Sequence, residues 1–155
     1  MSSRAESTRR LERELGVLVR RLKRVVGERS RELHPELQPA SYWMFTHLAE
    51  QGPLRASALV ETLDIDKGAV SRHVQHLIDL GLVDRTPDPE DGRATLISVT
   101  PEGARRLADV DEHRRAWFSG ALGEWDDDEL RAFAEDLARY NETIDRARSA
   151  VPARA

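Results

Sequence analysis

The chain has 155 residues, of which 34% are charged and 39% hydrophobic, and it carries a formal net charge of -4. A chain of this size accommodates one medium domain, or one small domain with a helical extension. It has no cysteine, which excludes disulfide bonds and thiol-based redox sensing.

The distribution of charged and apolar residues bears on location and partners. No apolar run approaches the roughly 20 residues of a membrane span. The N-terminus is polar and rich in arginine, without the apolar stretch of a signal peptide. We therefore expect a cytoplasmic protein without a membrane partner. The negative net charge argues against a nucleic-acid binder, but arginines crowd the first part of the chain and carboxylates crowd residues 124–129.

A helix is predicted over residues 6–30, because apolar residues recur there at steps of four and three. This spacing forms a short, narrow heptad seam, and arginines occupy the other faces of the helix. The helix could pack on its own domain alone, but so narrow a seam on so charged a helix favours contact with another helix, of this chain or of a second chain. The seam residues are Leu11, Leu15, Leu18, Leu22 and Val25.

A second helix is predicted over residues 40–51, after a linker that contains two prolines, and Gly52 with Pro53 ends it. The scarce aromatic residues of the chain are concentrated in this helix. Large aromatic side chains usually belong to the core. Some of them could instead line an apolar cavity for an aromatic ligand, with Trp43, His47 and the distant Trp117 as candidate contacts.

The stretch 53–103 has the layout of a winged helix-turn-helix. A short helical run, ASALVETL, ends at a polar turn around Asp64 and Asp66. A second run, KGAVSRHVQHLIDL, stops at Gly81. Two β-rich segments, LVDRT and ATLISVT, follow it, joined by the turn-rich PDPEDGR. In this layout the second helix enters the major groove of DNA, with the ribbon beside it.

The second of these helices has a polar face suited to reading bases. At about 100° per residue, its apolar side chains fall in one sector, and its small, amide and arginine side chains fall on the opposite side. Arginine suits guanine and glutamine suits adenine. An ordinary amphipathic helix is the alternative interpretation, and the adjacent ribbon favours DNA. The apolar sector holds Val70, Val74, Leu77 and Ile78, and the polar sector holds Gly68, Ser71, Arg72, Gln75 and Asp79.

The segments AVSRHVQHLIDLGLVDR and PDPEDGRATLISVTPEG resemble the DNA-binding core of the MarR family of bacterial transcription regulators. The resemblance rests most on the wing and on the exit from it. The residues concerned are Arg85, Asp88, Asp91 and Arg93 in the wing, and Thr100, Pro101, Glu102 and Gly103 at the exit.

The resemblance implies a homodimer that binds pseudo-palindromic DNA, and in this family a small molecule or an oxidant often releases the DNA. The chain departs from the family pattern at one position of the wing tip. The family often has two arginines there, and Gly92 replaces the first of them. Arg93 is therefore the expected contact in the minor groove, whose negative potential attracts arginine.

Two more helices are predicted, over residues 101–122 and from residue 124 onward. Thr100 caps the first helix, and Pro101 occupies its first position. Asp126 and Glu129 resemble a capping box at the start of the second helix. Carboxylates are favoured at the start of a helix by its dipole, so the acidic cluster has a structural explanation without a metal or a catalytic role.

The helices at the two ends of the chain carry apolar stripes, and their most economical packing is one helical layer. A pair of chains related by a two-fold axis would bury these stripes and present two DNA-reading helices. The expected interface residues are Leu11, Leu15, Leu18, Leu130 and Leu137.

These patterns together predict a mainly α fold with a small two-stranded β-wing, in which a winged helix-turn-helix is joined to a helical dimerisation layer from the chain ends. The expected segments are an N-terminal dimerisation helix (1–36), the DNA-binding lobe (37–100), C-terminal dimerisation helices (101–148) and a flexible tail (149–155).

We expect a homodimeric, sequence-specific transcription regulator, a repressor, that binds a pseudo-palindromic operator in double-stranded DNA and that a small aromatic or phenolic effector could release. Ser71, Arg72 and Gln75 would face bases, and Arg93 would enter the minor groove. Phosphate contacts would come from the remaining basic residues of the motif. The full expected DNA-binding set is Lys67, Gly68, Ser71, Arg72, Gln75, Arg85 and Arg93.

Other classes of function fit the sequence less well. A winged-helix protein-interaction module without DNA binding is the main alternative, because acidic residues surround the motif. The sequence shows no catalytic triad pattern, no phosphate-binding glycine loop and no spaced set of metal ligands. We therefore expect no enzyme activity, metal or cofactor.

Overall fold

The computed structural model describes residues 3–149. The chain divides into two compact units, Met1–Glu112 and His113–Ala155. In chain order the elements are α1 (Arg4–Leu33), α2 (Pro39–Gln51), β1 (Leu54–Arg55), α3 (Ala56–Leu63), α4 (Lys67–Asp79), β2 (Val83–Asp88), β3 (Asp91–Val99), α5 (Pro101–Ala121) and α6 (Asp127–Ser149). Helices dominate, as the sequence predicted, and within residues 3–149 none of them has the length and hydropathy needed to cross a membrane.

Helix α1 is longer than the predicted 6–30 at both ends. It begins with a capping box, in which the Ser3 hydroxyl accepts from the backbone N–H of Glu6 and the Glu6 carboxylate accepts from the backbone N–H of Ser3. Its buried residues all lie near its C-terminal end, from Val26 to Leu33, where α1 packs on α2. The preceding turns expose the apolar seam, since Leu11, Leu18 and Leu22 are 39–48% exposed.

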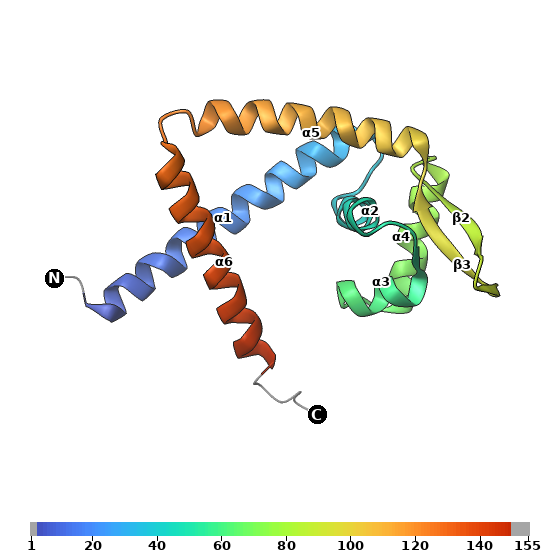
Figure 1. Ribbon diagram of the computed structural model, residues 1–155, viewed down its shortest axis with the longest axis horizontal. Helices are drawn as coiled ribbons and strands as arrows, with labels where there is room; N and C mark the ends of the chain where they lie inside the picture. Colours follow the sequence, from blue (N-terminus) through green and yellow to red (C-terminus); the bar gives the residue numbers. More distant parts are fainter. Residues whose placement is uncertain (1–2, 150–155) are drawn as a thin grey trace. The chain divides into compact units, whose positions relative to one another are not determined.

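Helices α2, α3 and α4 pack together into a lobe, with the β2–β3 ribbon beside α4 (Figure 1). The lobe is built on residues that the helical period directs inward, and Phe45, Leu59 and Leu77 are fully buried. Burial of each such side chain stabilises the fold by about 1.5–3 kcal/mol. The buried apolar residues of the lobe and of the segments packed on it are Val26, Leu33, Leu37, Tyr42, Met44, Phe45, Leu48, Leu59, Val70, Val74, Leu77, Leu82, Val83, Ile97 and Val110.

The sheet has one strand more than the predicted two-stranded wing. Strands β2 and β3 form the predicted antiparallel ribbon, and the short β1 pairs with the other edge of β3, so that the order is β1-β3-β2. Leu54 lies opposite Ile97, and Arg55 lies opposite Leu96. The sequence prediction missed β1 because two residues between a Gly-Pro turn and a helix carry no alternation of their own.

The start of α5 follows the sequence prediction. Thr100 caps the helix, because its hydroxyl accepts from the backbone N–H of Gly103 at 3.0 Å, and it also donates to the carbonyl oxygen of Gly81 at 2.7 Å. Gly103 is buried against Leu82 and Phe45. A methyl group at this position would overlap the carbonyl oxygen of Leu82, so only glycine allows this approach.

The second unit contains the end of α5 and helix α6. The predicted capping box at Asp126 is confirmed, since its carboxylate accepts from the backbone N–H of Glu129 at 2.9 Å, and the Glu129 carboxylate accepts from that of Asp126 at 3.0 Å. Aromatic side chains pair edge to face here, Trp117 with Phe118 and Trp125 with Phe133. Of the predicted flexible tail, Ser149 ends α6, and residues 150–155 lie outside the described residues.

Replacing Gly103 by alanine should lower the free energy of unfolding by about 1–3 kcal/mol, because the new methyl group must displace the backbone of Leu82. The matched control is Gly120→Ala in the same helix, where nothing lies within 4 Å of the new methyl group. That change should leave stability unchanged or raise it by about 0.5–1 kcal/mol. Urea unfolding curves measure both, and equal stability of the two variants would contradict the packing described for Gly103.

Candidate nucleic-acid interface

Helix α4 presents a polar face because its other face is buried. Asp66 caps its start, with its carboxylate accepting from the backbone N–H of Ala69 at 2.9 Å. Asp64, in the turn before it, adopts the left-handed conformation with φ of 52°, which asparagine and aspartate tolerate better than most residues. Val70, Val74 and Leu77 are at most 1% exposed. The predicted buried sector is therefore confirmed, with Ile78 half-buried at its edge.

The residues predicted to face bases all lie on the exposed side of α4. Ser71, Arg72 and Gln75 are exposed, and Lys67 and Gly68 are exposed in the first turn. The Arg72 guanidinium lies back along the helix toward Gly68, 3.5 Å from where a methyl group on Gly68 would be. That is an ordinary contact distance, and the closer neighbour of such a methyl group would be the Asp66 carboxylate oxygen at 3.0 Å.

Two histidines that the sequence did not assign to DNA fix α4 to the rest of the lobe. The Nδ1 atom of His73 lies 3.0 Å from the hydroxyl of the buried Ser41 on α2. The Nε2 atom of His76 lies 3.1 Å from the carbonyl oxygen of Glu36. Burial lowers the pKa of His73, and the nearby Arg72 and His76 lower it further. Below the exposed face, α4 is therefore held by polar contacts as well as by the core.

The wing is anchored by an ion pair between its tip and the distant β1. The Arg55 Nε atom donates to the Asp88 carboxylate at 2.7 Å, and Asp88 also accepts from the backbone N–H of Glu90 at 2.9 Å. This backbone N–H and the Arg55 guanidinium lower the pKa of Asp88, so the pair stays charged. The role of Arg55 was not predictable from the sequence, because Arg55 and Asp88 are 33 positions apart and no local pattern links them.

Arg93 and Arg85 are exposed on the two strands of the wing. The backbone N–H of Arg93 donates to the Asp91 carboxylate at 3.1 Å, which shapes the tip. Within residues 3–149 the guanidinium of Arg93 forms no ion pair, so it is available to a phosphate or a groove. Arg85 instead donates to the Gln75 side-chain oxygen at 3.4 Å, which brings the wing and the polar face of α4 together.

Asp79 orients the amide of Gln75. The Nε2 atom of Gln75 donates to the Asp79 carboxylate at 2.9 Å, one helical turn away, while its oxygen faces Arg85. An amide fixed in this way presents its donor and its acceptor in a defined order, which is what adenine requires of a glutamine. Sequence analysis placed Asp79 on the polar face without a role.

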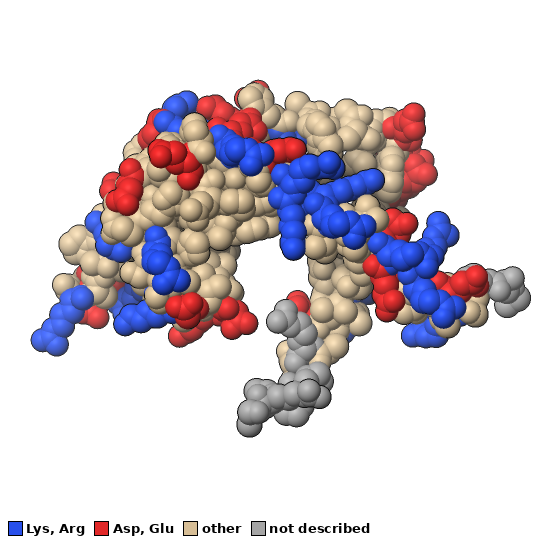
Figure 2. All heavy atoms as spheres, turned by 180° about the vertical axis from the view of Figure 1, so that it is seen from behind, with Lys and Arg blue, Asp and Glu red and all other residues tan. Residues whose placement is uncertain are grey.

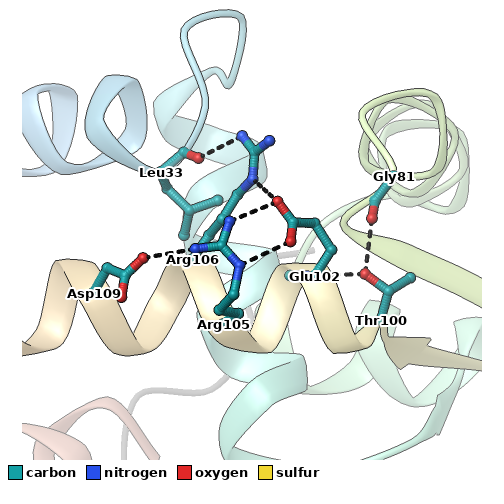
Figure 3. A network of polar contacts seen from close by, with 8 residues as sticks. Leu33, Gly81, Thr100, Glu102, Arg105, Arg106 and Asp109 are labelled. Carbon is teal, nitrogen blue, oxygen red and sulfur yellow. Dashed lines mark hydrogen bonds and ion pairs between the residues drawn. The ribbon is translucent and has the colours of Figure 1, made fainter.

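A network at the start of α5 joins this interface to α1 (Figure 3). Glu102 accepts hydrogen bonds from Arg105 and Arg106, and these bonds lower the pKa of Glu102 to about 2. Arg106 also donates to the carbonyl oxygen of Leu33, at the end of α1, at 3.2 Å. The end of α1, the start of α5 and the turn after α4 are thereby connected.

The remaining predicted residues have these positions. Trp43 is 56% exposed on α2, His47 is half-buried on the same helix, and Trp117, in the second unit, is 61% exposed. Among the expected interface residues, Leu11, Leu18 and Leu137 are exposed, and Leu15 and Leu130 are half-buried. Within residues 3–149, no cluster of three or more histidine, aspartate or glutamate side chains has the geometry to hold a metal ion.

The helix-turn-helix, the anchored wing and the polar face of α4 define a winged helix-turn-helix protein. The model of the MarR family matches residues 36–94. The HTH-type transcriptional regulator YxaD of Bacillus subtilis is 32% identical over 86% of this chain and 92% of its own length. The chain belongs to the MarR family.

Solved structures show the same fold. Rv1404 of Mycobacterium tuberculosis superposes with a TM-score of 0.76 at 22% identity, over 92% of this chain and 97% of that one. A Listeria monocytogenes protein described as a MarR family transcriptional regulator, complexed with 26mer DNA, gives a TM-score of 0.67 at 21% identity, over 85% and 87% of the two chains.

The partial burial of His73 predicts a pH-dependent stability. Because its folded pKa lies below 6.5, the unfolded chain binds the proton more tightly. The contribution of His73 to the free energy of unfolding is fully present above its pKa in the unfolded chain. It is lost as the pH falls from that value toward the lowered pKa of the folded protein. Urea unfolding on either side of pH 6.5 should show this loss in the wild type and a smaller loss in His73→Gln. The same pH dependence of stability in both proteins would contradict this role of His73.

Asp79→Ala should weaken the preference for the base that Gln75 is predicted to contact, because the amide is then free to turn. A good side-chain to base pair provides about 1–3 kcal/mol of discrimination. Asp79→Asn removes the same charge but retains an acceptor, so it should keep the preference. Binding to a selected duplex and to its single-base variants measures the difference, and an unchanged preference in Asp79→Ala would contradict the role of Asp79.

Proposed function

We propose that the chain is a homodimeric, sequence-specific DNA-binding transcription regulator and that it acts as a repressor. The observation that carries this proposal is the exposed face of Ser71, Arg72 and Gln75, held beside a wing with an unpaired Arg93. Similarity to regulators, one of them a relative of known fold complexed with DNA, supports the same conclusion.

The side chains divide between reading bases and holding phosphates. We assign Ser71, Arg72 and Gln75 to base edges in the major groove, which is wide enough for a helix. Lys67 lies in the first turn of α4, where a basic side chain can reach a phosphate. Arg93 extends from the wing and suits the minor groove. Release of Arg85 from Gln75 would let it contact a phosphate.

Exposed apolar residues near the two ends of the chain support a dimer. Leu11 and Leu22 on α1 and Phe133 and Ile144 on α6 are 40–55% exposed, and large apolar side chains of this kind are costly to leave in water when they form a stripe. A two-fold pair would cover them and would place two copies of α4 about 34–36 Å apart, one helical turn of DNA. We therefore propose segments 1–36 and 101–148 as the dimerisation layer.

Control by a small aromatic or phenolic effector is the remaining part of the proposal. Trp43 and Trp117 each expose more than half of their surface, so an aromatic compound can reach both rings. A compound that binds one state of the dimer better would shift the DNA affinity. Titration of phenolic compounds should change tryptophan fluorescence and DNA affinity together. No change in either would contradict control by such an effector.

Selection of bound sequences from a random duplex pool tests the proposed function. A two-fold symmetric motif is expected, with half-sites about 10–10.5 base pairs apart. Absence of any salt-dependent duplex binding would instead favour a protein-interaction module, an alternative that the carboxylates of Asp79, Asp84 and Asp91 around the motif would suit.

Arg72→Ala should cost about 1–3 kcal/mol of binding free energy and relax the sequence preference at one base of each half-site. The control is Arg139→Ala, which removes another exposed arginine, one that is paired with Asp136 on α6. Competition binding with single-base variants of the selected duplex measures the preference. Equal weakening for all sequences would reduce Arg72 to a phosphate contact.

A further inference from the structure

Five arginines follow one face of α1, and the proposed function does not use them. At about 100° per residue they fall within a sector of about 60°. This sector lies opposite the apolar seam of the same helix, so a partner subunit on the seam would leave it uncovered. This arginine stripe consists of Arg9, Arg13, Arg20, Arg24 and Arg31.

The stripe is exposed and carries uncompensated charge. All five arginines are exposed, and no ion pair holds any of them within residues 3–149. By contrast, Arg105 on α5 and Arg131 and Arg139 on α6 each pair with a carboxylate three or four residues away. Figure 2 shows basic side chains gathered along α1 on this face of the molecule. A chain with a net charge of -4 therefore keeps a concentrated positive surface on one helix.

The stripe matches an extended anion in length and chemistry. Neighbouring arginines are four or seven residues apart, which is about 6 or 10.5 Å along the helix, and the whole stripe spans about 33 Å. Duplex DNA offers a phosphate charge every 1.7 Å of its axis or so. Arginine binds phosphate through two parallel hydrogen bonds, which lysine cannot do. A membrane-surface helix would need its apolar face in the lipid, and here the basic face lies on the opposite side.

The stripe lies outside the groove-reading surface. Within the first unit, α1 packs on α2, and α2 packs on the buried side of α4. The polar face of α4 points away from α2, so the thickness of a helix, about 10 Å, separates the two surfaces. Most of the stripe belongs to the part of α1 that has no buried residue.

We propose that the arginine stripe is a second DNA-binding surface, which holds the phosphate backbone of a duplex segment other than the one that α4 reads. This inference rests on the proposed function, because it assigns the stripe to the same kind of partner. A regulator with both surfaces would hold its operator and a second stretch of DNA at once, without sequence preference for the second.

A capture experiment with the full chain tests the stripe. A short duplex with the selected sequence is immobilised and saturated with protein, and a labelled duplex of unrelated sequence is added. The wild type should capture the labelled duplex, and the triple variant Arg13→Gln, Arg20→Gln, Arg24→Gln should lose this capture while it still binds the immobilised duplex. The logarithmic salt slope for the second duplex should fall by about 3.

The matched control is Arg131→Gln, Arg139→Gln, Arg146→Gln on α6, which removes the same charge from exposed positions and should capture the second duplex like the wild type. A variant with lysine at the three α1 positions keeps the charges, so it should retain most of the salt dependence of binding to the second duplex. Because the chain has no cysteine, Arg20→Cys with a photoactivatable aryl azide gives an independent measurement, and it should cross-link to the unrelated duplex where Arg131→Cys does not.

The outcomes separate this inference from the proposed function. Operator binding without stripe-dependent capture or cross-linking would overturn the inference alone, and the stripe would then fit an acidic protein. If no operator is found, binding of the unrelated duplex by the free protein still tests the stripe. Loss of this binding in the α1 triple variant supports the stripe as a DNA-binding surface. Equal binding by both triple variants overturns it.

Discussion

The burial of one side of α4 is the constraint on which the rest of the interface depends. Val70, Val74 and Leu77 are enclosed by the lobe, and the helical period then leaves Ser71 and Arg72 in water. Rotation of the helix by one residue, about 100°, would bury Ser71 and Gln75 in place of Val70 and Val74. Burying a polar group without a hydrogen-bond partner costs free energy. The packing that stabilises the lobe therefore also fixes which side chains can meet DNA.

Polar contacts between residues far apart in the sequence position α4 and the wing, in addition to the packing of the core. Ser41 holds His73 across 32 positions, and Arg55 holds Asp88 across 33. The first contact sets α4 on α2, and the second sets the wing on β1. A hydrogen bond gives a defined direction as well as a distance. Helix α4 and the wing are thus each held by one specific side-chain contact, and a single substitution at either contact would remove it.

Local patterns were sufficient for the existence of the helices, for two of their caps and for the ribbon, but not for the Ser3 capping box of α1. The caps at Thr100 and Asp126 could be predicted because a cap joins residues only three positions apart. Strand β1 and the Arg55–Asp88 pair could not, because each exists only once distant segments meet. The same holds for the orientation of Gln75, which depends on Asp79 within α4 and on Arg85 from the wing. Which side chains of α4 are exposed was predictable from the helical period, but the contacts that position them were not.

The hydrogen bond between Arg106 and the last carbonyl of α1 links the end of α1 to the start of α5. Thr100, which caps α5 less than two turns before Arg106, donates to the carbonyl oxygen of Gly81 in the turn after α4. No flexible linker lies between these two attachments, only a short rigid segment of α5. A displacement of the end of α1 would therefore be passed through this segment to the turn that precedes β2.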